Sequence, residues 1–72
     1  MEKRYKSEIK AFGKRLKSIR LKKGLTQLDL ELESGISRTE ISRIENGLKN
    51  IEFYTIVKLA EALGITLGEF FQ

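Results

Sequence analysis

The stretch GLTQLDLELESGISRTEISRIENG, residues 24–47, determines the expected fold, because it holds the start signals of two short helices. Thr26 stands three residues before Asp29, and Ser37 stands three residues before Glu40. A hydroxyl followed at this spacing by a carboxylate is typical of a capping box, in which both side chains bond free N–H groups at a helix start. A glycine between the two signals indicates a tight turn. The predicted helices span residues 27–33 and 38–45, within a motif at residues 26–45.

The second of these helices has two chemically different sides. Ile41 and Ile44 lie three residues apart and form an apolar side that continues the contact of Ile36. The opposite side is polar and carries Arg38, Thr39, Ser42 and Arg43. Two short helices joined by a glycine-containing turn form a helix-turn-helix, in which the second helix presents one face to solvent. A polar, basic face of this kind fits the major groove of DNA.

The rest of the chain is also helical in pattern. It contains no proline, and its apolar residues recur at the spacing of a helix face. The clearest run is Ile9, Phe12, Leu16 and Ile19. We therefore predict an all-α, compact five-helix domain at residues 8–72, preceded by a basic N-terminal arm at residues 1–7. The three further helices are expected at residues 8–22, 53–63 and 67–71.

Composition excludes several kinds of function. The 72 residues include no Cys and no His, so the chain has no thiol nucleophile, no imidazole base and no common set of zinc ligands. No apolar run approaches the about 18 residues of a membrane span. We predict a cytoplasmic, non-enzymatic protein with no metal, no cofactor and no membrane association. A core this small is usually supported by disulfides, a metal or self-association, and only self-association remains.

The charge is concentrated at one end of the chain. Residues 1–23 carry ten basic and two acidic side chains, a net charge of +8, whereas the other 49 residues carry a net charge of −4. This asymmetry favours binding to a polyanion, either nucleic acid or an anionic membrane surface. A lysine face that is merely solvated explains the charge equally well, and both interpretations stay open at this point.

A long part of the sequence resembles the phage-repressor helix-turn-helix family of the Cro/CI or Xre type. The resemblance covers 60 of the 72 residues, from Phe12 to Phe71. It rests on FGKRLKSIRLKKGLTQ at residues 12–27, GISRTEISRIENG at residues 35–47 and IVKLAEALGI at residues 56–65. It implies a lambda-repressor-like DNA-binding fold. The SRTEIS segment and the two terminal phenylalanines are most similar to restriction–modification controller proteins within this family.

The resemblance also implies roles for single residues. In the family the first exposed positions of the recognition helix touch base edges, and here these are Arg38 and Thr39. Arg43 lies one turn beyond Thr39 and is expected to contact a second guanine or a phosphate. Arginine offers a donor fork to guanine, and the threonine methyl group suits thymine. Phosphate contacts are expected from Gln27, Ser42, Asn46, Lys49 and Asn50. Glu40 is assigned to helix capping rather than to a cytosine contact.

Other positions have a structural interpretation. Arg20 and Glu45 correspond to a family salt bridge that ties the first helix to the end of the recognition helix, and we expect this pair to be buried. Glu31 departs from the family, which usually has a small alanine where the two helices of the motif approach each other. Either these helices are splayed, or Glu31 tilts outward toward Arg38. Leu32 is apolar on a side that is expected to be exposed, and the sequence offers no reason for it.

The apolar side chains near the C-terminus predict a homodimer. The short last helix carries more apolar area than its own docking requires, which favours an interface between two copies. The alternative is that one phenylalanine simply fills the core of the single chain. The predicted interface residues are Ile51, Phe53, Leu67, Phe70 and Phe71. A two-fold dimer would hold its recognition helices about 34 Å apart and would bind a near-palindromic operator with half-sites about 10 to 11 base pairs apart.

The predicted function is therefore regulation of transcription by sequence-specific binding of double-stranded DNA. Repression by excluding RNA polymerase and activation by contacting it both stay open. No small-molecule effector is evident, so the protein's concentration and dimerisation are expected to control its activity. The main alternative is a protein-interaction module, antitoxin-like or coactivator-like, that grips its partner through Leu32 and the terminal phenylalanines. An enzyme that relies on Glu and Lys alone is a remote third class.

Overall fold

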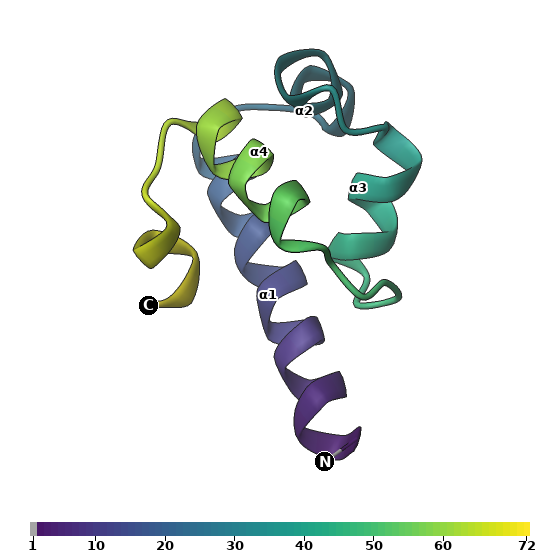
Figure 1. The fold of residues 1–72 in the computed structure, drawn as a ribbon. Coiled ribbons are helices and arrows are strands. Elements are labelled where there is room, and N and C mark those ends of the chain that lie inside the picture. Colours follow the sequence, from purple (N-terminus) through teal and green to yellow (C-terminus); the bar gives the residue numbers. More distant parts are fainter. Residues whose placement is uncertain (1) are drawn as a thin grey trace.

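The computed structural model describes residues 2–72, which form four α-helices followed by a short 3-10 helix (Figure 1). The elements are α1 (Glu2–Lys22), α2 (Gln27–Ser34), α3 (Arg38–Glu45), α4 (Phe53–Leu63) and η1 (Leu67–Phe71). No strand occurs among the described residues. The predicted all-α helix-turn-helix fold is confirmed, and the fifth helix of the prediction is a 3-10 turn.

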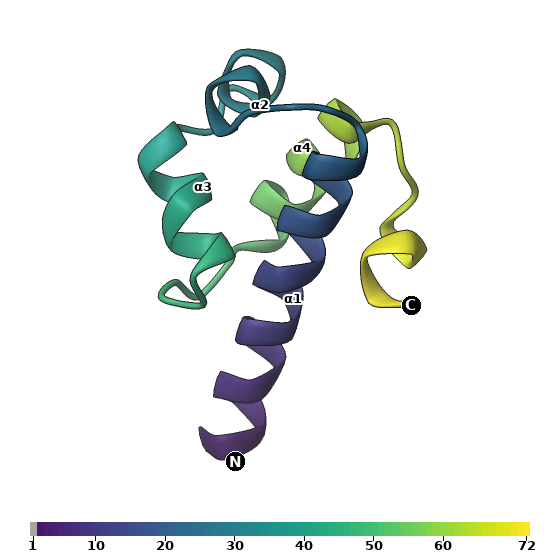
Figure 2. The same cartoon turned by 180° about the vertical axis from the view of Figure 1, so that it is seen from behind.

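The long helix α1 organises the molecule. It packs against α3 and η1, while α4 packs against α2 and η1, and α2 packs against α3. Figures 1 and 2 show α2, α3 and α4 gathered around the C-terminal half of α1, with the N-terminal turns of α1 extending beyond them. The molecule measures 34 × 24 × 21 Å, and the 21 residues of α1, at about 1.5 Å each, account for its long axis.

The first helix begins earlier than expected. We predicted a start at Glu8 after a separate arm, but α1 begins at Glu2. The expected arm covered residues 1–7, of which Met1 lies outside the described residues, and the remainder is a continuous extension of α1. The spacing of the apolar residues indicated this earlier start, because the apolar stripe of the helix continues back by one turn to Tyr5.

Hydroxyl side chains cap the helix starts where the sequence indicated them. The Thr26 hydroxyl accepts from the Asp29 N–H, and the Asp29 carboxylate accepts from the Thr26 N–H at 2.8 Å, which completes a capping box. This backbone hydrogen bond lowers the pKa of Asp29, so the cap is charged at neutral pH. At α3 only half of the box forms, because Ser37 accepts from the Glu40 N–H while the Glu40 carboxylate lies 3.9 Å from Lys49 Nζ. The expected capping role of the Glu40 carboxylate is therefore wrong.

The turn between α2 and α3 requires a glycine. Gly35 has a φ of 77°, in the left-handed region that strains other residues, and its N–H donates to the Glu31 carbonyl at 2.8 Å. The Ser34 hydroxyl donates to the Leu30 carbonyl and accepts from the Ile36 N–H. These bonds end α2 and start the chain in the new direction that α3 follows.

The core lies between α1 and the other elements. Its buried apolar residues are Phe12, Leu16, Leu30, Ile41, Ile44, Leu59, Ala60, Leu63 and Phe70. The Phe70 ring is only 2% exposed and lies 5.0 Å from the Phe12 ring, measured between centroids. The prediction that Phe70 belongs to a dimer interface is therefore wrong, because η1 turns this ring inward to close the core of the single chain.

Gly13 marks the closest approach of α1 to α3. A Cβ atom at this position would meet the Ile44 carbonyl oxygen and would lie 2.9 Å from the Glu45 carbonyl oxygen. The last turn of α3 therefore rests directly on the backbone of α1. The sequence hinted at such a crossing, because a glycine inside a helix costs about 1 kcal/mol relative to alanine.

We expect Gly13→Ala to lower the free energy of unfolding by about 1 to 3 kcal/mol, because the added methyl group has no room against the α3 backbone. Ser18→Ala, at an exposed position of the same helix, is the control and should change stability by less than about 0.5 kcal/mol. Urea denaturation followed by circular dichroism measures both. A Gly13→Ala protein as stable as the parent would contradict the packing of α3 on α1.

Candidate nucleic-acid interface

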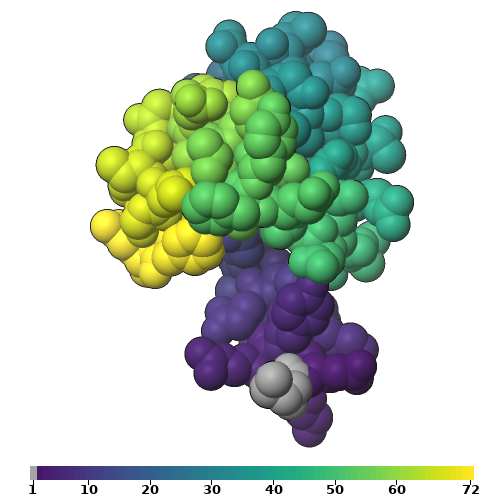
Figure 3. All heavy atoms as spheres, in the orientation of Figure 1, coloured from purple at the N-terminus to yellow at the C-terminus, as the bar shows by residue number. Residues whose placement is uncertain are grey.

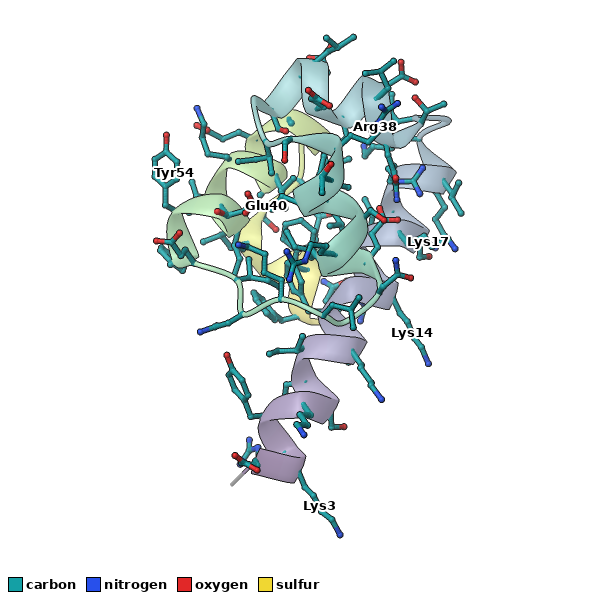
Figure 4. All side chains as sticks on the ribbon, turned by 90° about the vertical axis from the view of Figure 1, so that its right-hand side faces the viewer. Lys3, Lys14, Lys17, Arg38, Glu40 and Tyr54 are labelled. Atoms are coloured by element: carbon teal, nitrogen blue, oxygen red, sulfur yellow. The ribbon has the colours of Figure 1, made fainter. Side chains whose placement is uncertain are left out.

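The polar side of α3 forms an open surface with the start of α2. One shallow depression there is lined by Gln27, Arg38, Thr39, Ser42 and Arg43. Arg38, Thr39 and Arg43 are exposed, whereas the opposite side of α3 is buried. Figure 4 faces the side of the molecule on which α3 lies and shows Arg38 at the start of this helix. The fold thus brings together the three residues predicted for base contacts and two of those predicted for phosphate contacts.

A buried ion pair anchors α3 to α1. Arg20 Nε donates to Glu45 Oε2 at 2.7 Å, and Arg20 Nη2 donates to Glu45 Oε1 at 2.9 Å, so the contact is bidentate. The two side chains are 7% and 3% exposed. Arg20 Nη1 also donates to the Leu25 carbonyl, which ties down the connection between α1 and α2. The hydrogen bond to Glu45 raises the pKa of Arg20, so the guanidinium keeps its charge.

Gln27 joins this ion pair from the start of α2. Its Nε2 donates to Glu45 Oε1 at 3.1 Å, so the carboxylate at the end of α3 receives hydrogen bonds from both α1 and α2. Three helices therefore meet at one carboxylate. We predicted Gln27 as a phosphate contact, and nothing in the sequence indicated that its amide also has this internal partner. Its side chain still lines the depression beside α3, where a phosphate can reach it.

Glu31 tilts outward toward Arg38, which is one of the two alternatives that the sequence left open. Its carboxylate Oε1 accepts from the Arg38 backbone N–H at 2.9 Å. This N–H belongs to the first turn of α3, where helical N–H groups have no partner within the helix and a negative charge is favourable. Glu31, at the position where the resemblance leads us to expect a small alanine, therefore acts as a second cap for α3, and α2 and α3 still pack against each other.

The loop after α3 places its polar residues on different surfaces. Asn46 Nδ2 donates to the Ser42 carbonyl at 2.9 Å and lies 3.4 Å from the Ser42 hydroxyl, so both side chains stay beside α3. Lys49 is close to Glu40, the carboxylate that the sequence assigned to capping. Asn50 instead lines a hollow on the other side of the loop, against α1. Of the three loop residues predicted for phosphate contacts, Asn50 lies apart from the α3 face.

An apolar groove separates the N-terminal turns of α1 from the rest of the protein. Its apolar lining is Tyr5, Ile9, Phe12, Ile51, Ile56 and Phe71. Figure 3 shows the N-terminal turns of α1 standing away from the body on this face. Two of the predicted interface residues, Ile51 and Phe71, therefore meet in one groove, and Phe71 is 65% exposed. Phe53 is exposed outside the groove, and Leu67 packs against the core. We did not predict that Tyr5, Ile9 or Ile56 would line this groove, because the groove depends on the extended start of α1.

The arrangement of α2 and α3 defines a class of protein. A short helix, anchored at its end by a buried ion pair and capped at its start, presents two arginines and a threonine on an open surface. A protruding helix of this kind is what the about 12 Å wide major groove of DNA admits. Among residues 2–72, no three His, Cys, Asp or Glu side chains gather as metal ligands would. None of the helices formed by these residues is both long and apolar enough to cross a membrane. The fold and surface are those of a helix-turn-helix DNA-binding domain.

Comparison with known proteins agrees with this class. The helix-turn-helix family matches residues 16–70, and the chain belongs to that family. Control protein C.MunI from Mycoplasma sp is 39% identical over 62 residues, which make up 85% of this chain and 84% of that protein. The restriction–modification controller protein C.AhdI from Aeromonas hydrophila has a similar structure, with a TM-score of 0.87 at 38% identity over 89% of this chain and 97% of that one. Controller protein C.Esp1396I, solved as a tetramer in complex with its natural 35-base-pair operator, gives a TM-score of 0.82 at 33% identity over 88% and 83% of the two chains.

We expect Arg20→Ala to lower the free energy of unfolding by about 3 to 5 kcal/mol, because it leaves the buried Glu45 carboxylate without its cation. Arg4→Ala is the matched control, since Arg4 lies 3.8 Å from Glu8 in an exposed pair and its loss should cost less than about 1 kcal/mol. Thermal and urea unfolding of both variants tests the difference. A loss below about 1 kcal/mol for Arg20→Ala would contradict the anchoring role.

Proposed function

We propose that this protein regulates transcription by binding a specific sequence of double-stranded DNA as a homodimer on a near-palindromic operator. The observation that carries the proposal is the outward face of α3, where Arg38, Thr39 and Arg43 are exposed beside a buried anchor. Family membership supports it, as does the operator complex solved for C.Esp1396I. No catalytic step is part of this function.

Base recognition is assigned to three side chains. Arg38 and Arg43 each carry a planar donor fork that matches the N7 and O6 acceptors of guanine in the major groove. Thr39 offers a methyl group to thymine and a hydroxyl to a neighbouring base edge or phosphate. Each well-placed contact of this kind is worth about 1 to 3 kcal/mol of discrimination against the wrong base.

Phosphate binding positions α3 in the groove. Gln27 lies at the start of α2, where free N–H groups and the positive end of the helix dipole favour an anion. Ser42 and Asn46 already bond each other beside α3 and can turn one donor toward a phosphate oxygen. Lys49 adds a positive charge at the end of the same face. Asn50 is the weakest member of the predicted set, because it lines the groove against α1.

The homodimer is proposed to form on the apolar groove between the start of α1 and the loop before α4. Tyr5 is 49% and Phe71 is 65% exposed there, and Phe53 and Tyr54 are exposed on the adjacent start of α4. A second copy would bury these rings across a two-fold axis, with Phe71 and Ile51 at the centre. Two recognition helices about 34 Å apart then read half-sites separated by one turn of DNA.

Regulation follows from occupancy of the operator in the cytoplasm. A dimer bound over a promoter excludes RNA polymerase, and a dimer bound beside a promoter can contact it. Occupancy depends on the concentration of the protein, because dimerisation and DNA binding are coupled by mass action. A second candidate function is protein docking, which is favoured by Leu28 and Leu32, two exposed residues one turn apart on the outer side of α2.

The first test is selection of duplex sites from a random DNA pool at about 150 mM salt, where binding that depends on phosphates alone is weakened. We expect the parent protein to enrich a near-palindromic motif that contains guanines. Arg38→Ala should lose the preference for one guanine in each half-site, at a cost of about 1 to 3 kcal/mol, because its fork makes that contact.

Arg4→Ala is the control for this selection, since it removes the same charge from an exposed position on α1. It should keep the motif of the parent. Selection of no motif by the parent protein would contradict sequence-specific binding and favour the docking function. A motif that survives Arg38→Ala unchanged would contradict the role of Arg38 alone.

The dimer is tested by Phe71→Ser in sedimentation equilibrium. Burial of one phenylalanine side chain contributes about 1.5 to 3 kcal/mol, so loss of both rings should raise the dimer dissociation constant at least tenfold. Leu32→Ser removes an apolar side chain that is 75% exposed on α2 and should leave dimerisation unchanged. Circular dichroism melts check that both variants fold. An unchanged constant for Phe71→Ser, or a parent that stays monomeric at micromolar concentration, would contradict this interface.

A further inference from the structure

One side of α1 carries a continuous row of lysines. The row consists of Lys3, Lys6, Lys10, Lys14 and Lys17, and we call it the lysine ladder. The spacing of three or four residues keeps these side chains within about 80° of the helix circumference, at about 100° per residue. All five are exposed. Figure 4 shows the three labelled members, Lys3, Lys14 and Lys17, projecting from α1 toward the same side.

The positive charge of the lysine ladder is not neutralised by the protein. The acidic residues of α1 are Glu2 and Glu8, and Glu8 lies 3.8 Å from Arg4, on another side of the helix. Among residues 2–72, no ion pair joins a ladder lysine to a carboxylate. Five like charges on one helix side repel each other, and an external polyanion relieves that repulsion.

The lysine ladder lies next to the recognition helix. Gly13 faces the last turn of α3, and the loop after α3 lies directly against Lys10, because a Cβ at position 47 would come within 2.7 Å of the Lys10 side chain. In projection down the axis of α1, the ladder lysines lie at about 20° to 100° of rotation from Gly13, on the side away from the core. Figure 4 places Lys14 and Lys17 below Arg38 on the same edge of the protein.

We propose that the lysine ladder binds the phosphate backbone of duplex DNA beside the groove that α3 occupies, and so extends the contact beyond the base-reading surface. The inference rests on the proposed function and adds a second, separate set of contacts to it. At about 1.5 Å per residue the ladder is about 21 Å long, a distance over which a DNA duplex presents a dense row of phosphates at one charge per about 1.7 Å of axis. The N-terminal extension of α1 therefore serves to lengthen the bound stretch of DNA.

The geometry favours DNA over a membrane surface. A helix that binds a membrane lies in the interface with its apolar face in the lipid. The apolar face of α1 is instead occupied, since Phe12 and Leu16 are buried in the core. Only the charged side is available, which suits a water-exposed polyanion.

The test compares two double variants that remove the same charge from neighbouring positions of α1. Lys3→Gln with Lys14→Gln removes two ladder lysines, and Arg4→Gln with Arg15→Gln removes the residue that follows each of them. Arg4 and Arg15 lie about 180° and 200° from Gly13 around the helix, on the side away from α3. Both variants change the net charge from +4 to +2, so a uniform effect of charge is the same in both.

The measurement is the salt dependence of binding to the operator obtained by selection. Each phosphate contact adds about 0.9 to the slope of log affinity against log salt concentration. A dimer carries two copies of each lysine, so the ladder variant loses four contacts, and we expect the magnitude of the slope to fall by about 3.6. The loss of affinity between about 50 and about 200 mM salt should then be roughly 150-fold smaller than in the parent. The control variant should keep most of the parent's slope. Both should keep the selected motif, because α3 is unchanged.

Ethylation interference gives a second readout. Phosphates outside the base-reading contacts should interfere with binding of the parent and of the control, and should lose that effect in the ladder variant. Equal slopes and equal interference patterns in the two variants would overturn the proposal, and so would a ladder variant that loses affinity for vesicles of anionic lipid but not for DNA. The proposed function is contradicted by a different result, the selection of no motif by the parent protein. Circular dichroism melts confirm that both variants are folded.

Discussion

The ion pair between Arg20 and Glu45 is the contact on which the functional surface depends. Burial of two charges stabilises a fold only when their hydrogen-bonding groups are satisfied, and here both carboxylate oxygens are bonded, one of them also by Gln27. Helix α3 has eight residues, which is too short for a stable helix in isolation. Its direction is therefore set by this network at one end, by the capping carboxylate of Glu31 at the other, and by the apolar side that faces the core.

Three parts of the surface of α1 have different roles. Its apolar side forms the core with Phe12 and Leu16, and Gly13 receives the last turn of α3. The remaining side carries the lysine ladder into solvent. This division leaves the ladder lysines exposed to solvent, while Phe12 and Leu16 hold the same helix in the core. It also puts five exposed lysines beside the proposed base-reading surface, where their positive charge would favour both encounter with DNA and retention on it.

Much of the fold could be predicted because its signals are local. The start of α2 depends on Thr26 and Asp29, which are three residues apart, and helix ends at left-handed glycines are equally short-range. The start of α1 was missed because no pair of a hydroxyl and a carboxylate three residues apart marks it in the sequence, and only the spacing of its apolar residues indicated it. The choice between splayed helices and an outward Glu31 could not be made from the sequence, since it depends on where the first N–H group of α3 lies in space.

The sequence by itself determined the all-α class, the position of the helix-turn-helix, and the residues on the polar side of α3, because capping and helical periodicity act within a few residues. The tertiary structure decided which terminal phenylalanine is buried, since Phe70 and Phe71 are chemically identical and only the orientation of η1 against α1 and α4 distinguishes them. It also decided that Gln27 bonds Glu45 and that Asn50 faces α1. These outcomes depend on which elements far apart in the chain come into contact, and that is set by the packing of the whole core.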